Sequence, residues 1–236
     1  MVRISIVIPT YNEEKYIGAT LQSIARQPYH DIEVLLADSK SSDKTVVIAK
    51  KIYPSIKVVV DEKGGVSPAC NKAVKAAKAG IILFIDADTS ITKNLLKAYE
   101  EAFDDDGVVA ATGPIEPLEN TTSSISAGFK IISVYLVKFF ISIGKPSTIS
   151  SNLAVSKQAF QKIGGFNESM KTYYDWDLSN RIRKLGKVVF VPQAIAKTSV
   201  RRVKKWGMAK YFLYHAGNAV KYHLSHKSRD DYEPIR

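Results

Sequence analysis

Two aspartates one residue apart, Asp86 and Asp88, follow an apolar run at residues 81–85 that is typical of a strand. Carboxylate oxygens paired in this way suit Mg²⁺ or Mn²⁺. A divalent cation held there would bridge a diphosphate and neutralise the charge on a departing nucleotide. Aspartates after a strand are also common turn and helix-capping residues, and the Thr89-Ser90 pair that follows could cap as well. The motif alone leaves both interpretations open.

A second acidic pair, Asp175 and Asp177, opens a late helical stretch at residues 175–185. A carboxylate at the rim of a pocket can act as the general base that takes the proton from an attacking hydroxyl group. Acidic side chains in the first turn of a helix also stabilise its dipole, by a few tenths to about 1 kcal/mol. The residues by themselves do not choose between these roles.

Apolar, β-branched runs alternate with helical stretches, which predicts an α/β fold with a mostly parallel sheet flanked by helices. The predicted strands are residues 4–8, 33–37, 56–60, 81–85, 108–111, 152–155 and 188–191. The predicted helices are residues 15–27, 43–52, 68–79, 95–103, 157–163, 175–185 and 206–223. Ligands of open α/β sheets bind at the carboxyl ends of the strands. We therefore expect the polar segments 9–14, 38–43 and 86–89 to line a site.

Several motifs occur in an order that resembles the family 2 glycosyltransferases with the GT-A fold, over residues 4 to about 191. They are V-I-P-T-Y-N-E-E at 7–14, D-S-K-S-S-D-K-T at 38–45, a G-x-x-x-A-x-N element at 65–71, D-A-D at 86–88, G-G-F-N-E at 164–168, and Tyr174-Asp175 where the family has Glu-Asp. The resemblance implies a GT-A (Rossmann-like) catalytic domain over residues 1–197, with a nucleotide-sugar-binding half at 1–115 and an acceptor half at 116–197. Residues 198–236 would then form a basic helical C-terminal extension.

The resemblance also implies roles for individual residues. Asp175 would be the catalytic base of an inverting transfer, and Asp88 would be the direct ligand of Mn²⁺ or Mg²⁺. Asp86 would support that metal or contact the ribose, and Asp38 would accept a hydrogen bond from the base of a UDP- or GDP-sugar. The remaining residues that the resemblance assigns to substrate binding are Pro9, Thr10, Tyr11, Glu13, Asn71 and, as the weaker candidate, Asp177.

The chain departs from the family pattern at several positions. Lys40 and Lys44 stand where glycine is common, Cys70 replaces an arginine, and Tyr174 replaces the glutamate beside the base. The change at Cys70 affects contacts near the diphosphate, and the change at Tyr174 affects binding of the acceptor. The donor and acceptor specificity of relatives is therefore not assigned to this chain. No histidine lies between residues 188 and 200, where some relatives add a metal ligand, and water is expected to fill that position.

Positive charge is concentrated at the C-terminal end of the chain. The 236 residues carry a net charge of +11, and residues 197–236 hold ten Lys/Arg against three Asp/Glu. Such a segment suits an anionic membrane or a nucleic acid, or is a solvated basic surface. We interpret the basic run at residues 201–206 as a loop that grips a diphosphate or a lipid phosphate.

Cytoplasmic localisation, in peripheral contact with the inner face of the cell membrane, is the expectation for this chain. Cys70 is the single cysteine, which excludes an internal disulfide, and the first residues do not resemble a signal peptide. The apolar segment at 131–143 is shorter than the roughly 18–20 residues that cross a bilayer. We expect this segment, and the helix at 206–223 with Phe212, Leu213, Ala216 and Val220, either to pack on the domain or to lie on a membrane or lipid-linked acceptor.

Two other classes of protein remain as alternatives. A nucleotidyltransferase or a Rossmann dehydrogenase would need a glycine-rich phosphate loop after the first strand, but this chain has Pro9-Thr10-Tyr11-Asn12 there. A non-catalytic module that binds nucleic acid or a membrane would explain the basic tail but not the aspartates. We therefore expect a sugar transferase that acts on a glycan or a lipid-linked acceptor, with no nucleic acid partner and an oligomeric state that the sequence does not predict.

Overall fold

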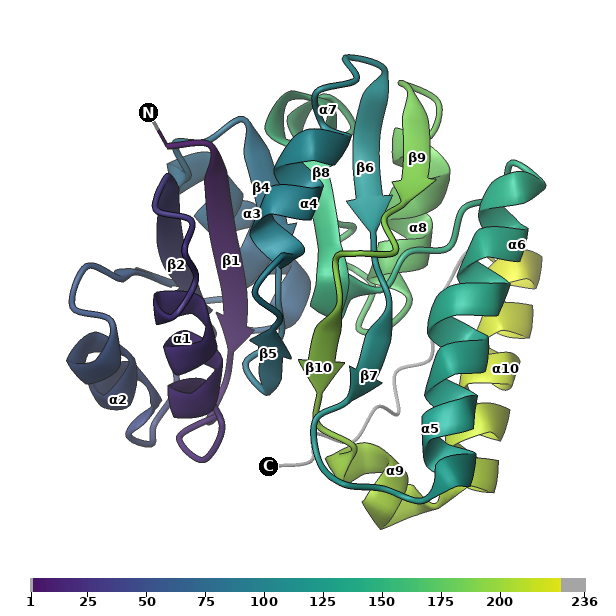
Figure 1. Cartoon of the computed structure of the whole chain (residues 1–236), viewed down its shortest axis with the longest axis horizontal. Coiled ribbons are helices and arrows are strands. Elements are labelled where there is room, and N and C mark those ends of the chain that lie inside the picture. Colours follow the sequence, from purple (N-terminus) through teal and green to yellow (C-terminus); the bar gives the residue numbers. More distant parts are fainter. Residues whose placement is uncertain (1, 226–236) are drawn as a thin grey trace.

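A seven-stranded sheet with helices on both faces forms the centre of the molecule (Figure 1). The computed structural model describes residues 2–225. The strands are β1 (Ile4–Thr10), β2 (Ile32–Asp38), β3 (Lys57–Val60), β4 (Ile81–Phe84), β6 (Val108–Thr112), β8 (Leu153–Ser156) and β9 (Lys187–Phe190), in the order β3-β2-β1-β4-β8-β6-β9. Neighbouring strands are parallel except β8, which is antiparallel to β4 and β6. The predicted mostly parallel sheet is confirmed.

Each face of this sheet carries its own hydrophobic core. Successive side chains of a strand point to opposite faces, so Ile6 and Ile8 of β1 enter one core and Val7 enters the other. The first core is covered by α1 (Ile17–Ala25), α2 (Thr45–Ile52) and α4 (Leu95–Ala102), and the second by α3 (Val66–Ala76), α7 (Lys157–Lys162) and α8 (Tyr174–Ile182). Strands buried on both faces are continuous apolar runs, which explains why the sequence located them within a few residues.

A second sheet of three short strands was not predicted. It consists of β5 (Thr89–Ile91), β10 (Ala196–Thr198) and β7 (Ile115–Pro117), in the order β5-β10-β7. A strand of three residues is too short to display an alternating pattern. This sheet brings the chain that follows β10 against the aspartate motif, where the Ser199 amide donates to the carbonyl oxygen of Asp88 at 3.1 Å.

Asn152, at the end of a short 3-10 turn (η2, Ser150–Asn152), ties the two sheets together. Its buried side chain donates to the carbonyl oxygens of Pro114 at 3.0 Å and Ala194 at 2.7 Å, and it accepts from the Tyr99 hydroxyl at 2.7 Å. Gly113 lies against the same segment, because a Cβ atom there would be 2.0 Å from the carbonyl oxygen of Ala194. Only glycine allows the two backbones to approach so closely.

One long helix runs along the side of the domain. It consists of α5 (Ser123–Lys130), a π-helical stretch η1 (Ile131–Leu136) and α6 (Val137–Ser142). By length and composition it could cross a membrane, with a mean hydropathy of 1.6 over a window of which 17% is buried. The expectation that no segment reaches this length was wrong, because the apolar run was counted from Ile131 while the helix begins at Ser123.

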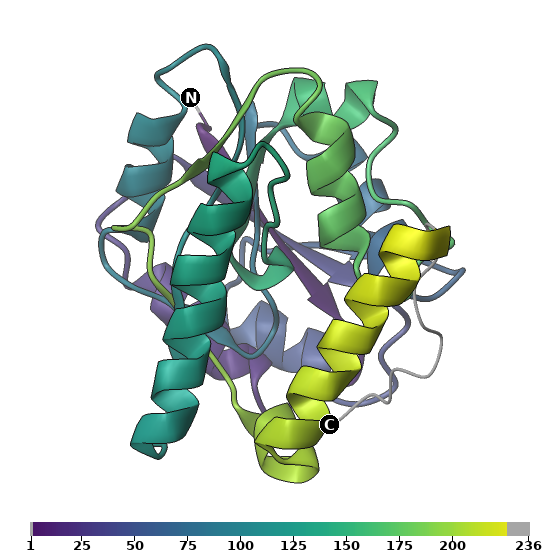
Figure 2. The same cartoon turned by 90° about the vertical axis from the view of Figure 1, so that its right-hand side faces the viewer.

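Two helices follow the small sheet. The basic run predicted as a loop is instead the helix α9 (Arg201–Trp206), and α10 (Met208–Ser225) confirms the predicted late helix. Gly207, with φ +78°, separates them. Figure 2 shows α10 and the helix α5–η1–α6 on the same side of the molecule. The side chains of Phe212 and Ala216, and the part of the basic extension at 226–236, lie outside the described residues.

Substituting Gly113→Ala is expected to lower the free energy of unfolding by about 3 kcal/mol or more, because the new methyl group would overlap the backbone of Ala194. Gly80→Ala is the matched control, since a Cβ atom at Gly80 meets nothing within 4 Å. Urea denaturation of the two variants measures both effects. Equal stabilities would contradict the close approach.

Candidate active site

The carboxyl ends of β1 and β2 form one side of the site. Asp38, opposite Thr10 in the strand register, is buried and accepts hydrogen bonds from the Thr10 hydroxyl at 3.0 Å and from the Ser41 amide at 3.0 Å and hydroxyl at 2.6 Å. An ionised carboxylate has about four acceptor positions, so roughly one remains on Asp38 for a ligand. Pro9 lines a pocket beside this edge, and Tyr11 is exposed next to it.

The loops that follow β1 and β2 are bonded to each other. The Asn12 amide donates to the Ser41 hydroxyl at 3.0 Å, and the Asn12 side chain accepts from the Ser42 amide at 2.8 Å. Asn12 and Lys40 have positive φ angles of 56° and 60°. The left-handed conformation at residue 40 gives a physical reason for the glycine that is common there, because a side chain costs roughly 1–2 kcal/mol in that region.

The aspartate motif that follows β4 lies beside a buried ion-pair cluster. Arg201, the first residue of α9, pairs through both terminal nitrogens with Glu13, at 2.9 Å each, and through Nε with Asp88 at 3.0 Å. Its guanidinium also lies over the ring of Tyr16, 4.3 Å from the centroid. The predicted substrate residue Glu13 is thus held by Arg201 in this structure, together with the predicted metal ligand Asp88.

Burial, and after it the neighbouring negative charge, raises the pKa of both aspartates of the motif. Desolvation, followed by the charges of Asp88, Glu13 and Asp175, raises the pKa of Asp86 to about 7. Desolvation also raises the pKa of Asp88, and the guanidinium of Arg201 opposes that rise. A cation at these two carboxylates would restore their ionised forms.

Asp86 and Asp88 suit a divalent cation of the hard type. Mg²⁺ is usually bound by one or two carboxylates together with phosphate and water oxygens. Within residues 2–225 no group of three or more His, Cys, Asp or Glu side chains is arranged to hold a metal. The donor set therefore fits an ion that takes its remaining ligands from a diphosphate and water.

Asp175 lies at the start of α8, on the far side of the site from β1. Its carboxylate accepts hydrogen bonds from the Ser150 amide at 3.1 Å and from the Trp176 amide at 2.9 Å. Desolvation outweighs these hydrogen bonds and raises the pKa of Asp175 to about 6. A carboxyl group with this pKa is ionised at neutral pH and still basic enough to accept a proton.

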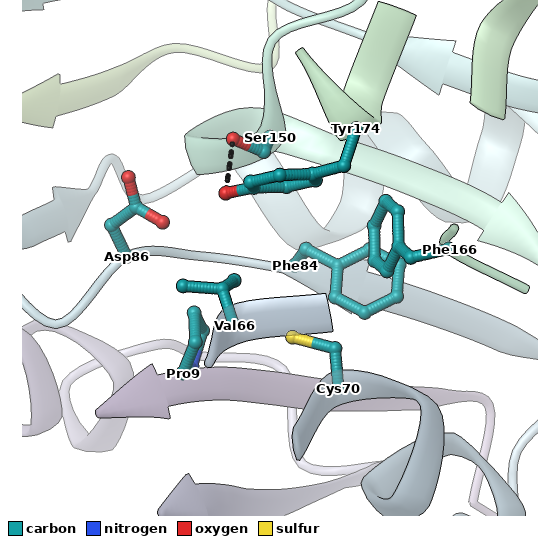
Figure 3. Close-up of a pocket in the computed structure, with 8 residues that line it drawn as sticks. All are labelled: Pro9, Val66, Cys70, Phe84, Asp86, Ser150, Phe166 and Tyr174. Carbon is teal, nitrogen blue, oxygen red and sulfur yellow. Dashed lines mark hydrogen bonds between the residues drawn. The ribbon is translucent and has the colours of Figure 1, made fainter. Parts of the chain in front are cut away.

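A small pocket joins the two sides of the site (Figure 3). In Figure 3 the hydroxyl of Tyr174 reaches towards Asp86 and donates to the Ser150 hydroxyl at 3.3 Å. Tyr174 thus closes the pocket where the family has a glutamate. The lining residues are Pro9, Val66, Cys70, Phe84, Asp86, Ser150, Phe166 and Tyr174.

Asp177, the other predicted acid of α8, is not brought to this pocket. It forms an ion pair with Arg181 at 2.6 Å, and Arg181 donates in turn to the carbonyl oxygens of Ile163 and Gly165. In this structure Asp177 therefore supports the turn that precedes the pocket residue Phe166.

Asn71 also holds that turn rather than lining the pocket. Its side chain accepts from the Phe166 amide and donates to the Phe166 carbonyl oxygen, both at 2.9 Å. Gly165 has φ +74°, and a Cβ atom there would be 2.5 Å from the Asn71 side-chain oxygen. The second glycine of G-G-F-N-E is needed for this contact between two motifs that lie far apart in the sequence.

Sequence reasoning did not predict that Arg201 contacts the acidic cluster. It lies 188 residues from Glu13 and reaches the cluster because the small sheet leads α9 to it. The concentration of Lys and Arg in the segment was visible, but no local pattern distinguishes Arg201 from its neighbours. Ser150, which bonds both Asp175 and Tyr174, likewise carried no signal.

Comparisons with known proteins agree with this fold. Two solved structures are similar over most of the chain: Staphylococcus aureus TarS in complex with UDP-GlcNAc, with a TM-score of 0.68 and 23% identity over 84% of this chain, and the mannosyltransferase PcManGT from Pyrobaculum calidifontis in complex with GDP-Man and Mn²⁺, with a TM-score of 0.67 and 19% identity over 91%. The chain covers 59% and 64% of those structures. The predicted GT-A glycosyltransferase fold is confirmed.

The family follows from the sequence match. Residues 5–164 match the model for glycosyl transferase family 2, which is more than half of the chain. This protein therefore belongs to glycosyl transferase family 2. A curated relative is the poly(ribitol-phosphate) beta-N-acetylglucosaminyltransferase TarS of Staphylococcus aureus, 37% identical over 41% of this chain. That match spans only 18% of the relative's own length.

Arg201→Met is expected to lower the free energy of unfolding by about 2–5 kcal/mol, because it leaves the carboxylates of Glu13 and Asp88 buried without their cation. Lys204→Met on the exposed face of the same helix is the control, and we expect a change within about 0.5 kcal/mol. Thermal and urea denaturation compare the two. Similar decreases in the free energy of unfolding of the two variants would show that the ion pairs of Arg201 do not stabilise the fold more than an exposed lysine does.

Proposed function

We propose that this protein transfers a sugar from a UDP- or GDP-sugar to an acceptor hydroxyl group with inversion at the anomeric carbon. The observation that carries the proposal is the gathering of Asp86, Asp88 and Asp175 around one site of a family 2 glycosyltransferase fold. The charge of Asp175 raises the pKa of Asp86, after the larger effects of desolvation, Asp88 and Glu13, so the two carboxylates lie within electrostatic reach of each other.

The nucleoside of the donor is proposed to lie over the carboxyl ends of β1 and β2. Asp38 is held in place by Thr10 and Ser41 and retains acceptor capacity for an N–H group of the base. Tyr11 is exposed beside it and offers a ring surface. Two relatives of known structure carry UDP-GlcNAc and GDP-Man, which supports a nucleoside diphosphate sugar as the donor class.

The diphosphate is proposed to lie next to the aspartate motif, with Mn²⁺ or Mg²⁺ held by Asp88 and supported by Asp86. When bound, such an ion neutralises the charge on the departing nucleoside diphosphate. The Mn²⁺ complex of the Pyrobaculum calidifontis mannosyltransferase supports this assignment. Arg201, paired here with Asp88, adds a positive charge at the same place.

Asp175 is proposed as the general base. Its two backbone hydrogen bonds fix the carboxylate, and the surrounding protein keeps it poorly solvated, so its basicity exceeds that of a surface aspartate. It would take the proton of the acceptor hydroxyl as the oxygen attacks the anomeric carbon. The acceptor, a glycan or a lipid-linked molecule, would enter next to Tyr174.

A thermal-shift panel of nucleoside diphosphates and their sugars, with and without Mn²⁺, tests the proposal directly, because a ligand that binds the folded state raises its melting temperature. A shift that needs both a UDP or GDP compound and Mn²⁺ supports a glycosyltransferase. Salt-sensitive binding of RNA or DNA, with no nucleotide-dependent shift, would instead favour the nucleic-acid-binding module.

Asp175→Asn is expected to lower kcat about 10²–10⁴-fold and to leave the affinity for the donor nearly unchanged, because the base acts on the acceptor. Asp88→Ala is expected to weaken Mn²⁺ and donor binding together. Asp106→Asn makes the same change at an exposed aspartate outside the site and serves as the control, with kcat and donor affinity expected to stay unchanged. Calorimetry and steady-state kinetics separate the effects, and equal, modest losses from both site variants would contradict this division of labour.

The pH dependence should follow the ionisation of Asp175. Because its pKa is about 6, kcat/KM is expected to fall nearly tenfold per pH unit below about 6 and to level off above it. The charge of Asp175 in turn raises the pKa of Asp86, Tyr173, Tyr174 and Tyr211. Rates measured from pH 4.5 to about 8 at saturating Mn²⁺ test this. If the residual activity of Asp175→Asn falls below about pH 6 in the same way, another group causes the fall in kcat/KM.

A further inference from the structure

We propose that the face formed by α5–η1–α6 and α10 docks on an anionic lipid bilayer and presents the site to acceptors carried by that bilayer. The docking itself is independent of the catalytic assignment, whereas the origin of the acceptor rests on the proposed function. Four features support the docking: the side chains that each helix turns outwards, the charge around them, the position of the two helices, and their contacts with the segment that holds Asp175.

The long helix turns several of its larger apolar residues away from the domain. Its buried positions are Gly128, Ser133 and Val137, and the Ser133 hydroxyl donates to a backbone carbonyl oxygen of β7 at 3.0 Å. The exposed apolar residues are Ile131, Tyr135, Leu136, Phe139 and, just beyond the helix, Ile143, and both Tyr135 and Phe139 are more than half exposed, at 57% and 55%. A surface helix in water has the opposite arrangement, with its apolar stripe facing the core.

Helix α10 shows the same inverted pattern. Tyr214, Asn218 and Tyr222, spaced four residues apart, face the domain and are buried. Leu213 and Leu224 are instead 73% and 82% exposed. Isolated exposed leucines are ordinary, but two helices on one side that both turn large apolar side chains outwards present more apolar surface than scattered residues do.

The charges around this surface select an anionic partner. Residues 123–145 contain three lysines and residues 199–225 contain six Lys/Arg, and neither segment contains an aspartate or glutamate. Lys130, Lys138, Lys210 and Lys221 are exposed on the helices themselves. Apolar side chains flanked by lysines are the combination that binds the interface of membranes with anionic lipids, at about 1 kcal/mol for each basic residue near the surface.

Both helices lie on one side of the molecule, so one flat partner can contact them together. They occupy the right-hand edge in Figure 1 and the near side in Figure 2. The inner residues of the long helix are anchored to the domain, with the ring of Phe140 at 5.3 Å from that of Trp176. A helix held along its length in this way lies on the bilayer surface rather than crossing it.

The segment that carries Asp175 is contacted from both helices. On one side Trp176 meets Phe140 of α6, and on the other the Tyr173 hydroxyl donates to the His215 carbonyl oxygen of α10 at 2.8 Å. The Asn218 side chain of α10 also donates to the Thr172 hydroxyl at 2.7 Å. The proposed docking face is therefore continuous with the segment that carries the base, and an acceptor held by the bilayer would enter the site near this segment.

Vesicle flotation tests the docking. The full chain is mixed with phosphatidylcholine vesicles with or without about one quarter phosphatidylglycerol, at low and high salt. We expect binding to the anionic vesicles at low salt, weaker binding at high salt because exposed charges are screened, and little binding to neutral vesicles. Absence of binding to anionic vesicles, or release only by detergent, would overturn the proposal, since the second result indicates a helix that spans the bilayer.

Single substitutions assign the binding to this face. Leu213→Asp and Phe139→Asp are each expected to reduce the vesicle-bound fraction several-fold, because each places a carboxylate at the apolar contact. Val47→Asp on α2 is the matched control, since Val47 is 67% exposed and lies on a different element. An equal loss of vesicle binding by the control variant would overturn the assignment to this face. If the Phe139→Asp variant does not fold, the Leu213→Asp variant tests the assignment by itself.

Two further measurements keep the outcomes distinct. Light scattering reports the mass in solution, and a dimer that Leu213→Asp converts to a monomer would mean that a second copy covers this face instead of lipid. Donor binding without vesicles is measured on the same variants. Vesicle binding without any nucleotide-dependent shift would refute the proposed function alone, and a nucleotide-dependent shift without vesicle binding would refute the docking alone.

Discussion

Negative charge concentrated at one poorly solvated edge of a sheet is the constraint on which this structure depends. Desolvation raises the pKa of Asp86 and of Asp88, and the neighbouring charge of Glu13 adds to both rises, so a buried carboxylate here without a cation would take up a proton. A protonated carboxyl group can neither hold a metal ion nor accept a proton from a substrate. Arg201, paired with Glu13 and Asp88, opposes this rise in the pKa of both aspartates.

The position of Arg201 depends in turn on the rest of the fold. The small sheet of β5, β7 and β10 places the start of α9 beside the aspartate motif, and Asn152 and Gly113 hold that sheet close to the large one. The last third of the chain thus completes a site whose first carboxylates belong to the first half. This arrangement couples the stability of the small sheet to the electrostatics of the site.

The acceptor side of the site is built differently from the donor side. Short loops between parallel strands, bonded to each other through Asn12 and Ser41, form the donor side. The start of α8, between α6 and α10, forms the acceptor side. The proposed donor side consists of strand ends and the loops that follow them, whereas the proposed acceptor side is bordered by helices whose outward surfaces are apolar and basic. The proposed recognition of the nucleotide and the proposed contact with a bilayer are therefore assigned to separate parts of the chain.

The sequence by itself determined the central strands, most of the helices, the family and the edge of the sheet where Asp38, Asp86 and Asp88 lie. It could do so because continuous apolar runs identify strands buried on both faces, and the carboxyl ends of parallel strands meet at one edge. Asp175 and Asp177 are both first-turn acids of α8, and only the resemblance to the family favoured Asp175 over Asp177. The tertiary structure showed the contacts of each, because the packing of α8 turns Asp175 to Ser150 and Asp177 to Arg181.

The tertiary structure also decided the contacts that are distant in sequence. Three-residue strands, the approach of Gly113 to Ala194 and the pairing of Glu13 with an arginine 188 residues away leave no periodic mark in the chain. The outward direction of Phe139 and Leu213 was equally undetermined, because an apolar helix has the same composition whether its side chains face a core or a solvent-exposed surface. Local patterns report local periodicity, whereas the partner of a side chain is set by how the elements pack.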